Sequence, residues 1–190
     1  MIRVITVITL VVSLGSIPAA GKQPSNWVGQ FDPCHGSSEL RKADHMDLGV
    51  RISTVNPILA NEFRHALDFW SDIIDMSWHL DNTFTCSIQL VDGTPDIFTD
   101  GTFAKSQFTE WGHFQGWVAF DPRATLTPTE MYYGSIHEIG HMLGLTHNPS
   151  PQSVMSGVDY DGSEWLDDSD LHALAARHRL RGSQTSLPVR

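Results

Sequence analysis

Apolar residues recur at steps of three and four positions in one segment of the first half of the chain, and this spacing predicts an amphipathic helix. Asn56 is a good N-cap for it, and Pro57 suits the first helical position. Charged residues occupy the other side, so the helix is expected to pack against a core through one face only. The apolar positions that define this face are Leu59, Phe63, Leu67, Trp70 and Ile74.

Three further segments have the pattern of strands. Residues 48–54 (LGVRIST) alternate apolar and polar positions as a half-buried strand does, and residues 86–93 (CSIQLVDG) form a second strand that ends in an Asp-Gly turn. Residues 116–122 (GWVAFDP) predict a third strand, which stops at its proline. The stretch from 97 to 113 is rich in turn residues and predicts no regular element.

A second helix is predicted from Pro128 to about Leu143. Thr127 and Glu130 form a capping box around Pro128, and Gly144 can turn the chain out of the helix in a left-handed conformation. Strands and helices in this order indicate an α+β fold. A chain of 190 residues is long enough for one domain with a sizeable core.

The N-terminal residues predict a secretory signal peptide. Arg3 precedes an apolar run from Val4 to Val12, and small residues follow at positions 19–21. The run is too short to span a membrane, and no other segment approaches the ~18 apolar residues that a membrane helix needs. We therefore expect a secreted, extracellular protein. Its predicted parts are a signal peptide (1–20), an irregular segment (21–45), a folded domain (46–180) and a flexible tail (181–190).

Charge and cysteine content narrow the function classes. The chain has 12 Lys and Arg against 22 Asp and Glu, and a net charge of −10 argues against nucleic acid as a partner. Two cysteines, Cys34 and Cys86, favour one disulfide in an oxidising compartment. The alternative is that Cys34 is a latency thiol that binds a metal ion and leaves Cys86 free.

A pattern typical of a zinc site lies in the stretch SIHEIGHMLGLTHNPSPQSVMSG. His137 and His141 are four residues apart on the second predicted helix, so their imidazoles project from one face and can bind the same ion. The chain then turns back and brings His147 as a third ligand. Three histidines leave one position of a tetrahedral zinc ion open, which indicates catalysis, and Glu138 lies beside them without being a ligand. Chance alone gives the whole pattern on the order of 10⁻⁴ times.

The chain resembles the metzincins, whose motif is H-E-x-x-H-x-x-G-x-x-H followed by a turn that contains a methionine, the Met-turn. Met155 has the position seen in matrixins, and the resemblance places it beneath the zinc-binding imidazoles. Leu166, Asp170 and Leu171 resemble the start of the matrixin C-terminal helix. The sequence departs from the matrixin pattern at Asn148, where those proteins usually have serine or threonine.

The resemblance covers the folded domain (46–180) and implies that it is a metzincin-like, matrixin-like catalytic domain, a zinc metallopeptidase domain. Its fold would be α+β: a twisted mixed sheet with an edge strand over the cleft, a long core helix, an active-site helix and a C-terminal helix after the Met-turn. It also implies a secreted endopeptidase with one catalytic Zn²⁺, which hydrolyses peptide bonds by a zinc-bound water with Glu138 as the general base.

The resemblance places an extended peptide or protein substrate along an edge strand, and it makes Tyr160 a candidate for the wall of the specificity pocket. We assign the edge strand to Gly116, Trp117, Val118, Ala119 and Phe120. A monomer is expected. Two main alternatives stay open, which are a zinc-binding interaction module without catalytic activity and a zinc hydrolase that acts on a non-peptide amide. A histidine-rich metal scavenger is disfavoured, because its histidines would be dispersed.

Overall fold

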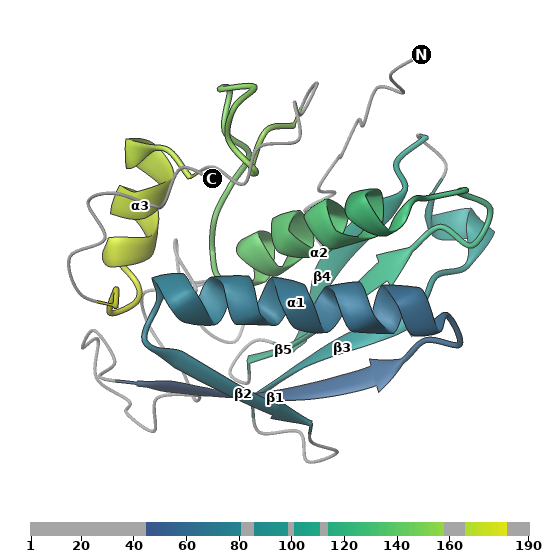
Figure 1. The fold of residues 1–190 in the computed structure, drawn as a ribbon, viewed down its shortest axis with the longest axis horizontal. Helices are drawn as coiled ribbons and strands as arrows, with labels where there is room; N and C mark the ends of the chain where they lie inside the picture. The colour runs from purple at the N-terminus through teal and green to yellow at the C-terminus, as the bar shows by residue number, and fades with distance from the viewer. Residues whose placement is uncertain (1–44, 81–85, 99–100, 111–113, 158–165, 182–190) are drawn as a thin grey trace, which may run out of the picture.

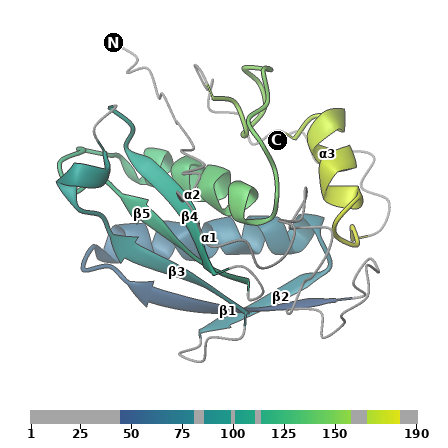
Figure 2. The ribbon, with the colours of Figure 1, turned by 180° about the vertical axis from the view of Figure 1, so that it is seen from behind.

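A computed structural model of the protein describes residues 45–80, 86–98, 101–110, 114–157 and 166–181. Within these ranges, five strands form one mixed sheet in the order β2-β1-β3-β5-β4, accompanied by three α-helices and a short 3₁₀ turn (Figures 1 and 2). This arrangement confirms the predicted α+β fold class. The strands are β1 (Met46–Ser53), β2 (Met76–Leu80), β3 (Cys86–Asp92), β4 (Ala104–Glu110) and β5 (Phe114–Phe120); the helices are α1 (Pro57–Ile73), α2 (Pro128–Met142), α3 (Asp168–Ala175) and the 3₁₀ turn η3 (Pro95–Ile97).

The direction of strand pairing changes only at one side of the sheet. Strand β1 pairs in parallel with β2 and β3, and β3 pairs in parallel with β5. Strand β4 is antiparallel to β5 and comes last in the strand order, so β4 is an edge strand of the sheet. Figure 2 shows β4 on the side of the sheet where α2 lies.

The prediction that residues 116–120 form an edge strand is therefore wrong. Residues 116–120 lie in β5, which is hydrogen-bonded to β3 on one side and to β4 on the other. The backbone groups of β5 are used within the sheet and cannot add a peptide as a further strand. The true edge strand falls in the stretch from 97 to 113, for which the sequence predicted no element.

The helices begin where their capping residues predict. Asn56 accepts hydrogen bonds from the backbone N–H groups of Ile58 and Leu59 at the start of α1. At the start of α2, Thr127 and Glu130 form the predicted capping box, in which the Glu130 side chain accepts from the Thr127 backbone N–H at 2.7 Å. These local bonds satisfy N–H groups that have no partner inside the helix.

The core lies between the sheet and the pair of helices α1 and α2, which pack against each other (Figure 1). Trp70 of α1 is fully buried, and its indole Nε1 donates to the backbone carbonyl of Ile136 in α2 at 3.0 Å. This bond satisfies the one polar atom of the Trp70 side chain and fixes the contact between the two helices next to the predicted metal site. None of the helices in the described ranges is long and apolar enough to cross a membrane.

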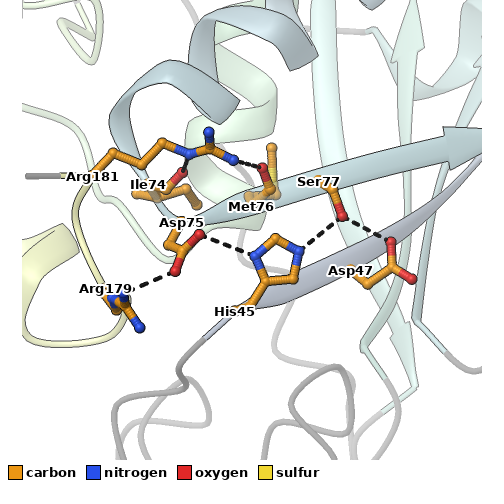
Figure 3. Close-up of polar contacts among 8 residues, drawn as sticks. All are labelled: His45, Asp47, Ile74, Asp75, Met76, Ser77, Arg179 and Arg181. Carbon is orange, nitrogen blue, oxygen red and sulfur yellow. Dashed lines mark hydrogen bonds and ion pairs between the residues drawn. The ribbon is translucent and has the colours of Figure 1, made fainter.

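The chain after α3 returns to the junction between α1 and β2 (Figure 3). Arg181 donates from Nε to the carbonyl of Ile74 at 3.2 Å and from Nη2 to the carbonyl of Met76 at 2.7 Å. In the same region, Asp75 accepts from Nδ1 of His45, which precedes β1, at 3.0 Å. Arg181, the first residue of the predicted tail, thus bonds to the folded domain.

Several predictions concern parts of the chain that lie outside the described residues. They are the signal peptide, the disulfide between Cys34 and Cys86 with its latency alternative, and the role of Tyr160. Cys86 begins β3, but its side chain is not among those described. These points stay predictions.

Candidate metal centre

The three histidines of the motif converge on one point. His137 and His141 lie in the last two turns of α2 and are buried, whereas His147 follows the helix and is exposed. One ligand atom from each ring lies within 4.8 Å of those of the other two. The ring centroids are 4.6, 4.9 and 5.3 Å apart, and the rings are inclined to one another instead of being stacked. This is a group that could hold a metal ion.

Backbone carbonyls orient the two helical imidazoles. Nδ1 of His137 donates to the carbonyl of Val154 at 2.7 Å, and Nδ1 of His141 donates to the carbonyl of Leu145 at 2.9 Å. These two bonds assign the proton of each neutral ring to Nδ1, so each Nε2 carries a lone pair. The two Nε2 atoms are only 2.9 Å apart. Two lone pairs at that distance repel each other unless a cation lies against both, and this geometry fits a metal site.

The end of α2 supplies one of these carbonyls. Gly144 has φ of 95°, the left-handed conformation predicted for it. Its N–H bonds to the carbonyl of His141 at 2.9 Å, and the N–H of Leu145 bonds to the carbonyl of Gly140 at 3.0 Å. This pair of bonds is a Schellman motif. It turns the chain so that the Leu145 carbonyl faces His141 and the next residues lead to His147.

Met155 packs against α2 at Gly140, one residue before His141. Its side chain is fully buried, and a Cβ at Gly140 would lie 2.5 Å from the Met155 sulfur. A Cβ at Gly157 would lie 3.1 Å from Cγ of His147. Gly140 therefore allows a close approach between α2 and the Met-turn, and Gly157 allows one between the Met-turn and His147. Any side chain at either position would obstruct the approach.

Asn148 and Asp170 fasten the loop that carries His147. The Asn148 amide donates to the Asp170 carboxylate at 3.1 Å, and the Ser153 hydroxyl donates to the same carboxylate at 2.6 Å. Both Asn148 and Asp170 are buried, and the Asn148 N–H also bonds to the Met155 carbonyl at 2.8 Å. One carboxylate in α3 therefore joins the residue after the third histidine to the Met-turn. At Asn148, the departure from the matrixin pattern keeps a hydrogen-bonding side chain.

Burial keeps the histidines neutral in the metal-free protein. Desolvation lowers the pKa of His137 well below its usual range, and the neighbouring His141 lowers it further. Desolvation also lowers the pKa of His141, to about 4, against a weaker opposing effect of its bond to Leu145. Partial desolvation lowers the pKa of His147 as well, although this side chain is exposed at its outer side. Neutral imidazoles are the form that binds metal, so the site is ready for an ion at neutral pH.

Glu138 lies between the histidines in sequence and is fully buried. Its Oε2 accepts a hydrogen bond from Oγ of Ser106 at 2.6 Å, and its Oε1 has no hydrogen-bond partner among the described residues. Desolvation raises the pKa of Glu138 to about 7, although the hydrogen bond from Ser106 acts in the opposite direction. A carboxyl group with a pKa near neutrality can both accept and release a proton under physiological conditions.

The structure brings the three predicted ligands together, whereas residues 116–120 do not form an edge. Glu138 is buried in the same helix as His137 and His141, and Met155 packs against Gly140 of that helix. Sequence reasoning missed Ser106 because β4 was not predicted. The signal that the sequence offers is the alternation of the small or apolar residues Ala104, Ser106 and Phe108 with the polar residues between them. In the sequence, Asn148 stands out only as a departure from the matrixin pattern, because its role depends on Asp170 in α3.

A comparison with known families agrees with this geometry. The family described as Matrixin matches residues 51–177, a span that includes α1, β3 to β5, α2 and α3. Matrixins are zinc-dependent peptidases, and the histidine triad is a group among the described residues that could hold the metal. The match covers more than half of the chain, and the chain therefore belongs to the matrixin family.

Proposed function

We propose that this chain is a secreted zinc-dependent endopeptidase, in which His137, His141 and His147 hold one zinc ion and Glu138 is the general base. The observation that carries the proposal is the buried Glu138 carboxylate, adjacent in sequence to the first ligand, with Oε1 unbonded among the described residues. A site that only stored or sensed zinc would have no need for a buried carboxylate, whose desolvation is costly.

The residues present fit zinc. Three imidazoles with their Nδ1 protons engaged by carbonyls present Nε2 to a common point, and zinc commonly binds in this way with one position left open. A bound zinc ion would supply Lewis acidity, which lowers the pKa of a coordinated water toward ~7 and polarises a carbonyl. Nitrogen ligands of intermediate softness suit zinc better than calcium or magnesium, which prefer oxygen.

Glu138 would handle the proton in the proposed reaction. Its Oε1 takes a proton from the attacking water while the water oxygen bonds to the scissile carbonyl carbon. The same proton then goes from Oε1 to the amine nitrogen as the C–N bond breaks, which returns Glu138 to the carboxylate. The raised pKa of Glu138 suits both transfers, because the carboxyl group is neither a very weak base nor a very weak acid near pH 7.

The substrate is proposed to bind along β4 in place of residues 116–120. Strand β4 pairs with β5 on one side, and no described strand pairs with its other side. Its outward N–H and C=O groups can add an extended peptide as a further strand. Ser106, in the middle of β4, bonds to Glu138, so a peptide on this edge lies close to the proposed base.

The proposal is tested with the secreted chain and its Glu138→Gln variant, which keeps all three histidines. Bound zinc is measured in both, and both are incubated with a mixed peptide library that is read by mass spectrometry. We expect one zinc per chain in each and cleavage by the parent alone. Zinc in both with no cleavage by either would favour an interaction module or a non-peptide substrate. Absence of zinc from the parent would contradict the assignment of the ligands.

A further inference from the structure

We infer that Ser106 is a positioning residue for Glu138. The Ser106 hydroxyl holds one oxygen of the Glu138 carboxylate, so that the other oxygen faces the reacting water. The inference rests on the proposed function of Glu138. Oγ of Ser106 donates to Oε2 of Glu138 at 2.6 Å, and both side chains are buried. Water competes little with a bond in such surroundings, and a bond to a charged acceptor is stronger than one between neutral groups.

The strand geometry explains why position 106 faces α2. Successive side chains of a strand point to opposite faces, and along β4 Ala104 and Ser106 are buried while Lys105 and Gln107 are partly exposed. Ser106 lies opposite Val118 of β5, which is also buried, and α2 packs against both strands. The hydroxyl of Ser106 is thus a polar group on an otherwise apolar surface.

Two other buried serines use their hydroxyls differently. Ser135 donates to the carbonyl of Met131 within its own helix at 2.8 Å, which is a common way to satisfy a buried hydroxyl. Ser153 donates to Asp170 and so fastens the Met-turn to α3. Ser106 instead joins β4 to α2 through the side chain proposed to move the proton.

The contact separates the roles of the two oxygens of Glu138. A carboxylate rotates about its Cγ–Cδ bond, and a fixed partner at Oε2 sets the plane in which the lone pairs of Oε1 lie. Oε1 has no hydrogen-bond partner among the described residues, so this oxygen is the one available to a water molecule. Ser106 therefore restricts Glu138 to orientations in which Oε1 can accept the proton, a restriction that lowers the entropic part of the barrier.

The kinetic test compares the zinc-loaded secreted proteins with Ser106→Ala, Ser106→Thr and the control Ser135→Ala. Because Ser106 contacts the base and not the peptide through its side chain, Ser106→Ala should lower kcat about tenfold and leave KM within about twofold of the parent. Ser106→Thr keeps the hydroxyl and should recover most of kcat, whereas Ser135→Ala should match the parent. A parental kcat for Ser106→Ala, or a change confined to KM, would overturn the inference. If alanine unfolds the protein, Ser106→Cys offers a similar volume with a weak donor.

A second measurement does not depend on activity. In the metal-free protein, the urea midpoints of Ser106→Ala, Glu138→Ala and the double variant form a cycle. Ser106→Ala should lower the midpoint in the parent and lower it much less once Glu138 is alanine. A crystal structure of Ser106→Ala should show the Glu138 carboxylate turned from its parental plane. Additive midpoints together with an unmoved carboxylate would overturn the inference.

The two proposals fail in different ways. If the parent cleaves peptides and Glu138→Gln does not, a parental kcat in Ser106→Ala removes the positioning role alone. If the parent binds zinc and cleaves no peptide, the proposed function fails, and the role of Ser106 in catalysis falls with it.

Discussion

Replacing Glu138 by glutamine should stabilise the metal-free protein at neutral and alkaline pH, although the same change removes the proposed general base. Desolvation raises the pKa of this buried carboxyl group from 4.5 to about 7. A raised pKa in the folded state means that the group's contribution to stability is present below its unfolded pKa and is lost as pH rises through the folded pKa. Glutamine does not titrate, so the variant does not lose this contribution.

The expected gain in unfolding free energy follows from the size of the Glu138 pKa shift. A difference of about 2.5 pKa units corresponds to roughly 3 kcal/mol of unfolding free energy. The advantage of Glu138→Gln over the parent should grow as pH rises from about 4.5 to 7 and should then stay constant. About 2 kcal/mol of it falls between about pH 5.5 and pH 8. The titration of His137 and His141 is common to both proteins and cancels in the comparison, and a glutamine side-chain oxygen can still accept the bond from Ser106.

Urea unfolding of both proteins in the presence of a chelator, at a series of pH values, measures this difference. The same pair with zinc serves as the control, because a nearby divalent cation favours the carboxylate form and should reduce the difference. A difference that is independent of pH, or that shrinks as pH rises, would refute the reasoning. It would mean that the carboxylate is solvated or paired in the metal-free protein.

Three further changes test the supports of the site. Asp170→Ala should lower the unfolding free energy by about 3 kcal/mol and weaken zinc binding, because the buried donors of Asn148 and Ser153 lose their acceptor. Urea unfolding measures the first effect, and a zinc titration against a competing chelator measures the second. An unchanged zinc affinity would contradict the link between Asp170 and His147. Gly140→Ala should destabilise the protein by about 2 kcal/mol despite the better helix propensity of alanine, since the new Cβ would lie 2.5 Å from the Met155 sulfur. Thermal unfolding measures this cost, and a gain in stability would show that the Met-turn moves easily. Removal of zinc by a chelator should abolish cleavage and lower the melting temperature, and adding zinc should restore both. The melting temperature falls because a ligand at ~1,000 times its Kd stabilises the folded state by about 4 kcal/mol. Circular dichroism follows the transition, and equal melting temperatures with and without zinc would exclude tight binding to the folded state.

Sequence reasoning predicted the features that are decided locally. The starts of α1 and α2 depend on Asn56 and on the capping box of Thr127, and the end of α2 depends on Gly144. The positions of His137 and His141 follow from helical spacing alone. In each case, the determining partners lie within a few residues of one another, so a pattern along the chain is enough to find them.

The two strands that were missed depend on partners far along the chain. Strand β2 (MSWHL) follows α1 closely, and the helical spacing of apolar residues extends to Ile74, which hides the change of element. Strand β4 (AKSQFTE) is mostly polar, because it is an edge strand with one partly exposed face. Its existence depends on antiparallel pairing with β5. Without β4, the pattern places the edge at residues 116–120, and the contact of Ser106 with Glu138 cannot be predicted.

The groups of the metal centre are arranged so that a cation among them is favourable, whereas without a cation their lone pairs repel one another. Two Nε2 lone pairs face each other at 2.9 Å, both helical imidazoles are kept neutral by burial, and Oε1 of a buried carboxylate has no partner among the described residues. The facing lone pairs and the buried carboxylate are unfavourable without a cation and favourable with one, and neutral imidazoles are the form that binds a metal ion. The supports of the site therefore have to hold the groups together against their own repulsion. The Schellman turn at Gly144, the packing of Met155 under Gly140 and the buried carboxylate of Asp170 supply that support from uncharged or paired contacts. A change in any of these supports should consequently reduce metal affinity by more than its effect on the stability of the rest of the fold, since the site relaxes locally before the domain unfolds.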